Sequence, residues 1–559
     1  MKRHYSISNK IALLLFTSFI IQNNSSFAVT LTPQQEQSLK SSEYNSGSFL
    51  SNLMKDLQRY KNESEAIGMK NLPKEEKEAK SVEAKPEAPD ISITLNKLEI
   101  PDSEVLSREE LDEISQEYSG KKVTIAELYQ AIDKINALYA KKGYVTTVAI
   151  LPPQKIENNV VKVQLIEGKI GQVSVENNKR TKTSYIKRFL NVPVGFVPNV
   201  EKLRRKIQKF NLTNKTILQI KMVAGEQPMT TDLYIVAVEP EKTRSTTIFS
   251  DNSGSENSGK YRYGLTYTDS NISGKCDIFN LSALFAKTSE TAMFSYNTPI
   301  GYDGSRLTIN HNSNKMRVNK GYMSDLDVRG ESSNNSISFI KPLRTSFSLR
   351  SELVLDVQQQ KSKTKILGNE FVRDTEKRYS IAYSETRIRG NSIYYFKPAY
   401  IYNQHKNIDG EHHNGDRLTL DAMWQKYLKK GDVVALRVSA QKDLDDYIPS
   451  ADQYYLGGQY SVRGYHENVI GGDAGVNVKF DYSFKTKIKG LNFVTFFDWG
   501  RLNGDTLLTT KDIYSAGFGF DYQRGNLLFS VYTGYPLKDK IGDQKIDKSV
   551  TNFSLSYTF

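Results

Sequence analysis

The C-terminal part of the chain, residues 242–559, consists of short runs in which apolar and polar positions alternate. The clearest runs have an apolar side chain at every second position: Tyr261, Tyr263, Leu265 and Tyr267 in one, and Phe553, Leu555, Tyr557 and Phe559 in the last. Alternation places one set of side chains on each face of a strand. Runs of about ten such residues, separated by Gly, Asn, Asp and Ser, predict a transmembrane β-barrel with lipid outside and a wet lumen inside.

The length of this region sets the size of the predicted barrel. At roughly 20 residues for each strand and its connection, residues 242–559 hold about 16 antiparallel strands, enough to enclose a channel. A soluble array of β-sandwiches is the alternative, but its strands would bury larger and more aliphatic cores. The chain is 38% hydrophobic yet contains 33 Tyr and 25 Phe, and these residues suit half-buried pleated surfaces. We therefore predict a mainly β protein.

Residues 91–241 have a different pattern, which predicts two small α+β domains in tandem. In residues 91–169, capping boxes begin at Ser107 and Thr124, and Gly143 ends the second helix. A strand precedes these helices and two strands follow them. Residues 170–241 repeat this layout, with a strand, two helical stretches and two further strands.

The N-terminus predicts export. Residues 1–28 combine a basic start, a short apolar core and a small-x-small cleavage site, as in a secretory signal peptide. An uncleaved anchor is the alternative, but no stop-transfer flank follows. Residues 29–70 contain one amphipathic helix whose apolar stripe includes Phe49, Leu53 and Leu57. Residues 71–90 mix charge with proline and predict a solvated linker.

Composition excludes several classes of protein. The 559 residues have a mean hydropathy of -0.52, and after the signal peptide no stretch approaches the ~20 apolar residues of a spanning helix. One cysteine, Cys276, excludes a disulfide scaffold and a multi-cysteine metal site. The formal charge of +13 comes from Lys and Arg spread along the chain, which gives no nucleic-acid footprint.

The first α+β domain resembles a known module. Gly143-Tyr-Val-Thr-Thr147, Leu151-Pro-Pro-Gln154 and Ile166-Glu-Gly-Lys-Ile170 are similar to the first POTRA module of two-partner secretion transporters of the TpsB type. The second unit shares the layout, with few of the module's diagnostic residues. Within the predicted barrel, Leu456-Gly-Gly458 and Val462-Arg-Gly-Tyr465 resemble the hairpin motif of the POTRA-barrel superfamily. Phe496, Asp498 and Gly500 resemble its strand motif.

The resemblance implies a role for each motif residue. The hairpin tip, Val462 to Tyr465, would fold from an outer loop back into the lumen, where Arg463 would pair with Asp498 on the wall. A guanidinium fork matches a carboxylate in two-pronged geometry, which lysine does not. Gly464 would allow a positive φ, Tyr465 would be a rigid anchor, and Gly500 would allow close approach of the loop.

The resemblance also implies a function and partners. It predicts a transporter in the outer membrane of a Gram-negative bacterium, with its POTRA domains in the periplasm. The transporter would capture an extended exoprotein of the TpsA type and secrete it without ATP, drawn outward as the client folds. The helix around Phe49 to Tyr60 would correspond to the family's plug helix, with a loose periplasmic extension as the alternative. Further implied partners are outer-membrane lipid and the barrel-assembly machinery, the latter reading the terminal strand that ends at Phe559.

Two other functions remain as alternatives. An outer-membrane barrel-assembly insertase of the same superfamily is the runner-up, although it carries more POTRA units. A lumen hydrolase comes third, because the six histidines form no catalytic pattern and no Gly-x-Ser-x-Gly elbow is present.

Two local patterns do not change this interpretation. In the phosphate-loop-like stretch from Gly254 to Lys260, the residue after the lysine is Tyr261 rather than Ser or Thr. His412 and His413 are predicted to lie in a surface loop and to point apart. We predict no catalytic residue, no metal and no cofactor.

Overall fold

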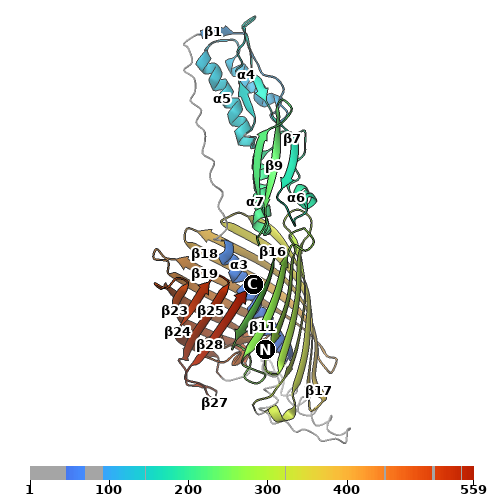
Figure 1. Cartoon of the computed structure of the whole chain (residues 1–559), viewed down its shortest axis with the longest axis vertical. Coiled ribbons are helices and arrows are strands. Elements are labelled where there is room, and N and C mark those ends of the chain that lie inside the picture. Colours follow the sequence, from blue (N-terminus) through green and yellow to red (C-terminus); the bar gives the residue numbers. More distant parts are fainter. Residues whose placement is uncertain are drawn as a thin grey trace, which may run out of the picture.

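The computed structural model describes most of the chain: residues 46–69, 92–144, 146–321, 323–445, 448–506, 510–542 and 544–559. The predicted signal peptide and charged linker lie outside these residues. In Figure 1 two small domains stand in line on one end of a barrel. Among the described helices, none is long and apolar enough to cross a membrane.

Sixteen antiparallel strands close the barrel, which confirms the predicted fold class. In chain order they are β10 (Arg244–Asp251), β11 (Arg262–Ser270), β12 (Ile278–Phe285), β13 (Ser289–Pro299), β14 (Arg306–Arg317), β15 (Arg329–Thr345), β16 (Leu349–Ile366), β17 (Asn369–Arg389), β18 (Ser392–Lys406), β19 (His412–Tyr427), β20 (Val433–Asp443), β22 (Ile470–Lys485), β23 (Leu491–Thr506), β24 (Asp512–Arg524), β25 (Leu527–Pro536) and β28 (Val550–Thr558). The circle closes where β10 pairs with β28, with Ile248 opposite Tyr557.

Alternation along the strands places apolar side chains outside. On β28, Leu555 and Tyr557 are 43% and 40% exposed on the outer face, whereas Asn552 is buried. Phe553 belongs to the same strand, and Phe559 follows it and donates its backbone N–H to the carbonyl of Thr246 at 2.8 Å. Exposed apolar side chains in a membrane strand face lipid, so the outside of this barrel suits a bilayer.

The first α+β domain contains β1 (Ser92–Leu95), β2 (Lys97–Glu99), α4 (Arg108–Tyr118), β3 (Lys121–Thr124), α5 (Ile125–Lys142), β4 (Val148–Ile150), β5 (Val160–Lys162) and β6 (Gln164–Ile166). Both predicted capping boxes are present, and Gly143 ends α5 with a φ of 87°. The apolar faces of α4 and α5 pack on the strands to form one core. The structure adds β3, which pairs with β1 and which the sequence pattern did not predict.

The second α+β domain contains β7 (Lys169–Glu176), α6 (Thr183–Leu190), α7 (Val200–Thr213), β8 (Ile217–Ala224) and β9 (Thr230–Val238). Its sheet has the order β7-β9-β8, with β7 parallel and β8 antiparallel to the central strand. Phe210 of α7 is fully buried in the apolar core of this domain. Cys276 enters the same core from the barrel turn between β11 and β12, so the domain and the barrel share apolar packing.

Two elements lie inside the barrel. The connection between β20 and β22 is described at residues 444–445 and 448–469 and leaves the barrel wall at the end away from the α+β domains; we call residues 448–469 the inner loop. It carries the 3-10 turn η3 (Ser450–Asp452) and the short strand β21 (Tyr454–Leu456), which pairs with β22. Helix α3 (Ser46–Gly68) contacts η3 and the strands β14, β15, β16 and β18 (Figure 1). The lumen therefore holds both a loop and a helix.

Two short strands, β26 (Lys540–Ile541) and β27 (Gln544–Lys545), form a separate hairpin.

Candidate functional site in the barrel lumen

The structure brings Arg463 of the inner loop onto the barrel wall at Asp498 of β23. Arg463 Nε lies 2.7 Å from Asp498 Oδ2, and Nη2 lies 2.7 Å from Oδ1. The backbone N–H of Arg463 donates to the same carboxylate at 3.0 Å. Arg463 is 4% exposed and Asp498 is fully buried. A two-pronged pair of this kind fixes direction as well as distance.

Two further side chains contact the guanidinium of Arg463. Phe496 lies on the same strand face, and its ring centroid is 3.7 Å from Arg463 Cζ. Arg463 Nη2 also lies 2.6 Å from Asp481 Oδ1 on β22. The flat guanidinium thus stacks on an aromatic face while its edge is shared by two carboxylates. The strand motif supplied Asp498 and Phe496, but Asp481 was not predicted.

Glycines allow the loop tip to touch the wall. Gly464 has a φ of +99°, and a Cβ at this position would lie 2.9 Å from the carbonyl carbon of Gly534. At Gly500 a Cβ would lie 2.8 Å from the Leu456 side chain and 3.1 Å from that of Val462. Tyr465 is buried and donates its hydroxyl to the carbonyl of Tyr514 at 3.1 Å. The seven predicted motif residues therefore meet in one place.

A second anchor holds the other end of the inner loop. Asp452, on η3, is fully buried between strands β17 and β19. Its Oδ1 lies 2.7 Å from Arg417 Nη2 and 3.0 Å from Arg378 Nε, and Arg378 also pairs with Glu376 at 2.6 Å. The inner loop thus has two charged anchors on the wall, one on β17 and β19 and the other on β22 and β23. Glu376 and Arg378 share one strand face at i, i+2, and this charged inward pair was the available sequence signal.

Helix α3 joins the same charge network. Arg59 Nε lies 2.9 Å from Asp421 Oδ1 on β19, and Glu63 Oε2 lies 2.7 Å from Arg437 Nε on β20. Arg437 also pairs with Asp481, which pairs in turn with Arg463. A chain of ion pairs therefore runs from the helix to the tip of the inner loop. Of the predicted apolar stripe, Leu53 is buried, while the side chains of Phe49 and Leu57 lie outside the described residues.

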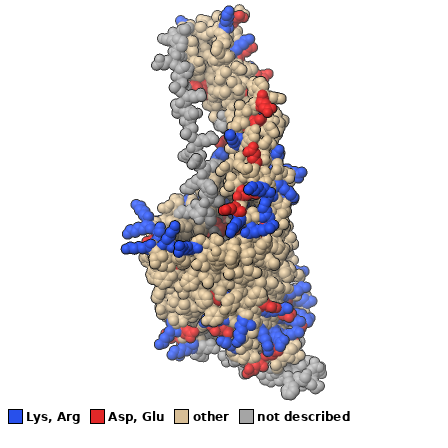
Figure 2. Space-filling view, in the orientation of Figure 1, with Lys and Arg blue, Asp and Glu red and all other residues tan. Residues whose placement is uncertain are grey.

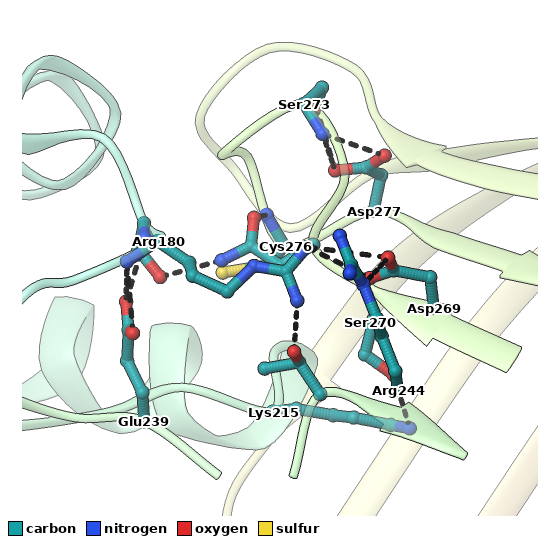
Figure 3. Close-up of polar contacts among 12 residues, drawn as sticks. Arg180, Lys215, Glu239, Arg244, Asp269, Ser270, Ser273, Cys276 and Asp277 are labelled. Carbon is teal, nitrogen blue, oxygen red and sulfur yellow. Dashed lines mark hydrogen bonds and ion pairs between the residues drawn. The ribbon is translucent and has the colours of Figure 1, made fainter. Parts of the chain in front are cut away.

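A polar cluster joins the second α+β domain to the barrel (Figure 3). Asp269, at the end of β11, pairs with Arg180 Nη2 at 3.1 Å and with Arg244 Nε at 2.9 Å. The carboxylate of Glu239 accepts the backbone N–H of Arg180 at 3.0 Å and that of Thr181 at 2.6 Å. Both carboxylates bind groups from residues 180–181, so the loop before α6 is held from two sides.

The pKa of Glu239 reflects these contacts. Burial disfavours its ionised form, but the amide N–H groups of Thr181 and Arg180 outweigh burial and lower the pKa below its usual value. A carboxyl whose pKa is lowered by folding stabilises the folded form above its ordinary pKa. This contribution disappears as the pH falls through the lower, folded-state pKa. Glu239 therefore stabilises the junction at neutral pH and loses this effect in acid.

Cys276 provides a direct reporter of this junction. Its thiol lies 3.7 Å from Thr216 Oγ1 and is 6% exposed, and burial raises its pKa. We expect a maleimide to react with the folded chain roughly tenfold or more slowly than with the chain unfolded in urea, because the reactive thiolate is scarce and covered. Asp269→Asn should speed the reaction, and Cys276→Ser measures background. Equal rates in the folded and unfolded chains would contradict a closed junction.

Comparisons with known proteins agree with this architecture. Residues 230–522, more than half of the chain, match the haemolysin secretion/activation protein ShlB/FhaC/HecB family, and residues 93–168 match the ShlB-type POTRA domain. The heme/hemopexin transporter protein HuxB of Haemophilus influenzae strain 86-028NP is 22% identical, over 81% of this chain and 84% of that protein. The outer membrane transporter CdiB of Dickeya dadantii strain 3937 is 19% identical, over 80% of this chain and 83% of its own length.

The solved structure of CdiB from Escherichia coli shares the fold. It has a TM-score of 0.67 and 16% identity, and the match covers 95% of this chain and all of that one. The predicted resemblance and location are therefore confirmed: the barrel lies in the outer membrane and the POTRA region in the periplasm. The chain belongs to the haemolysin secretion/activation protein (ShlB/FhaC/HecB) family, the outer-membrane transporters of two-partner secretion.

Proposed function

We propose that this protein captures one unfolded exoprotein in the periplasm and secretes it through the barrel lumen without ATP. One observation carries the proposal: two elements, α3 and the inner loop, occupy the lumen, and ion pairs tie both of them to the barrel wall. The two ion pairs of α3 are partly exposed to the lumen, and such pairs exchange with water at modest cost, so the helix can move aside.

The POTRA domains supply the capture surface in this proposal. In the three-stranded sheet of the second domain, β7 and β8 are the outer strands, and each pairs only with β9 among the strands described. An extended chain adds to such an edge through main-chain hydrogen bonds, which need little sequence specificity. Folding of the client outside the cell then removes the unfolded chain and drives net movement outward.

The terminal strand, β28, is the part of the chain that would signal to the barrel-assembly machinery. Phe553, Leu555 and Tyr557 alternate along β28 and Phe559 follows, and this strand pairs with β10 to close the barrel. We infer that the barrel-assembly machinery recognises this strand when it inserts the protein.

Deleting the gene tests the transporter against the insertase. We expect one exoprotein to disappear from the cell surface and culture medium, while the amounts of unrelated outer-membrane barrels stay unchanged. The measurement is quantitative proteomics of the outer-membrane fraction and the medium, with the deleted gene restored as the control. Loss of many barrels with no specific secreted protein would support an insertase and overturn the transporter.

A further inference from the structure

Two turns at the POTRA end of the barrel bring exposed lysines together. The turns are residues 428–432, between β19 and β20, and residues 486–490, between β22 and β23; they are neighbours because β20 pairs with β22. We call the exposed lysines on and beside these turns the rim lysines: Lys426, Lys429, Lys430, Lys485, Lys487 and Lys489. Figure 2 shows Lys and Arg side chains projecting sideways from this rim, on the side of β18 and β19 in Figure 1.

The charge of the rim lysines is not neutralised by acidic neighbours. In the described part of the chain, none of the six has an ion pair with a carboxylate. Asp432 is the acidic residue within the two turns, and its carboxylate accepts the backbone N–H of Lys485 at 2.9 Å and the Tyr482 hydroxyl at 3.3 Å. Six ammonium groups thus remain open to a ligand from outside the chain.

The surroundings place the rim lysines at the height of lipid headgroups. Just inside the rim, the outer face carries a row of aromatic rings: Tyr482 and Phe484 lie 4.3 Å apart between centroids, and Phe484 and Phe493 lie 5.9 Å apart. Aromatic belts of this kind mark the boundary between hydrocarbon and headgroups. Between Lys487 and Lys489, Ile488 is 61% exposed. An apolar side chain held out between two lysines suits an interface where acyl chains meet phosphates.

We propose that the rim lysines bind the phosphate groups of anionic phospholipids, of the phosphatidylglycerol class, in the periplasmic leaflet of the outer membrane. Lysine binds phosphate as a point charge, and its long stem lets the ammonium reach the headgroups while the methylenes cover apolar surface. Clustered basic residues at a membrane surface favour anionic over zwitterionic lipid.

The rim lysines lie at the ends of the strands that anchor the two lumen elements. They sit at the ends of β19, β20, β22 and β23, the strands that carry Asp421, Arg437, Asp481 and Asp498. These four residues hold α3 and the inner loop. Lipid bound at the rim therefore steadies the wall on which both lumen elements are anchored. This part of the inference rests on the proposed function, whereas lipid binding itself does not.

Native mass spectrometry of the full-length protein tests the binding. The protein is taken from nanodiscs of phosphatidylethanolamine with added phosphatidylglycerol, and the retained lipids are counted. We expect the wild type to retain phosphatidylglycerol in preference to phosphatidylethanolamine, less so at high salt. Replacing all six rim lysines by glutamine should reduce the retained phosphatidylglycerol at least tenfold, since each lysine near an anionic surface contributes about fivefold in affinity. Replacing them by arginine should preserve it.

A matched control removes the same charge elsewhere. Six exposed lysines at the opposite rim are changed to glutamine: Lys287, Lys315, Lys320, Lys361, Lys406 and Lys548. This variant should retain phosphatidylglycerol as the wild type does. The proposal is overturned if the rim variant still retains phosphatidylglycerol, if the control loses as much, or if the wild type retains both lipids equally. Heat-dependent migration on gels confirms that each variant is folded, so a loss of lipid reports binding.

Discussion

Replacing Arg463 by alanine should reduce secretion of the exoprotein at least tenfold while the folded barrel remains in the outer membrane. The substitution leaves Asp498 and Asp481 buried without their shared cation, and losing one partner of a buried pair typically costs about 3–5 kcal/mol. A loss of that size detaches the tip of the inner loop from the wall. The barrel keeps its strand pairing, because the ladders between β20, β22 and β23 do not use this side chain.

Two further variants test whether the pair depends on the two-pronged geometry of the guanidinium or on its charge alone, and whether Asp498 is the partner that matters. Arg463→Lys keeps the charge but cannot make the paired Nε and Nη2 contacts, so secretion should stay close to the alanine level. Asp498→Ala removes the other partner and should give the same defect. Secretion is measured by immunoblot of the medium, and folding by heat-dependent migration of the outer-membrane protein. Arg389→Ala, at the exposed last residue of β17, should secrete normally. Normal secretion by both Arg463→Ala and Asp498→Ala would refute the role of the pair.

Features that depend on near neighbours in sequence were predictable. The capping boxes at Ser107 and Thr124 and the C-cap at Gly143 are fixed by residues three positions apart or adjacent, and the structure contains all of them. Alternation predicted the strands of the barrel for the same reason, and the length of the region predicted their number as about 16. The short strand β3 was not predicted, because Val123 is its single buried side chain and one buried position does not make an alternating pattern.

Features made by distant residues were not predictable from the pattern alone. Glu63 and Arg437 are 374 positions apart, and Asp452 meets Arg378 from 74 positions away. Barrel closure brings such residues together, and no local spacing encodes it. Arg463 and Asp498 were paired in advance because their motifs resemble a family, which supplied the long-range contact.

The clustering of the rim lysines was also not predictable from the sequence. Along the sequence the basic residues look dispersed, since more than 50 positions separate Lys430 from Lys485. Pairing of β20 with β22 places their turns side by side and produces the rim lysines. Part of the positive charge is thus organised by the pairing of two strands, which gathers six lysines at the rim of the barrel that lies next to the POTRA domains.

Neutralising the charged contacts of α3 should open the lumen far more often. Arg59→Gln with Glu63→Gln removes the ion pairs to Asp421 and Arg437, which hold the helix from two strands. These side chains are partly exposed to the wet lumen, so each pair contributes roughly 1 kcal/mol. Losing both, about 2 kcal/mol, raises the population with the helix displaced by roughly thirtyfold. Planar-bilayer recordings of single channels measure this as more frequent openings of large conductance.

Exchanging the charges of Arg59 and Asp421 tests whether their ion pair holds the helix. Arg59→Asp alone should open the channel, whereas Arg59→Asp with Asp421→Arg restores an ion pair at the same place and should return the openings toward the wild-type frequency. Neutralising exposed Arg389 and Glu331 removes the same charges without touching the helix and should change nothing. If the double glutamine variant conducts like the wild type, the helix does not obstruct the pore. In that case the inner loop, held at Asp452 by β17 and β19 and at Arg463 by β22 and β23, is the element that closes the lumen.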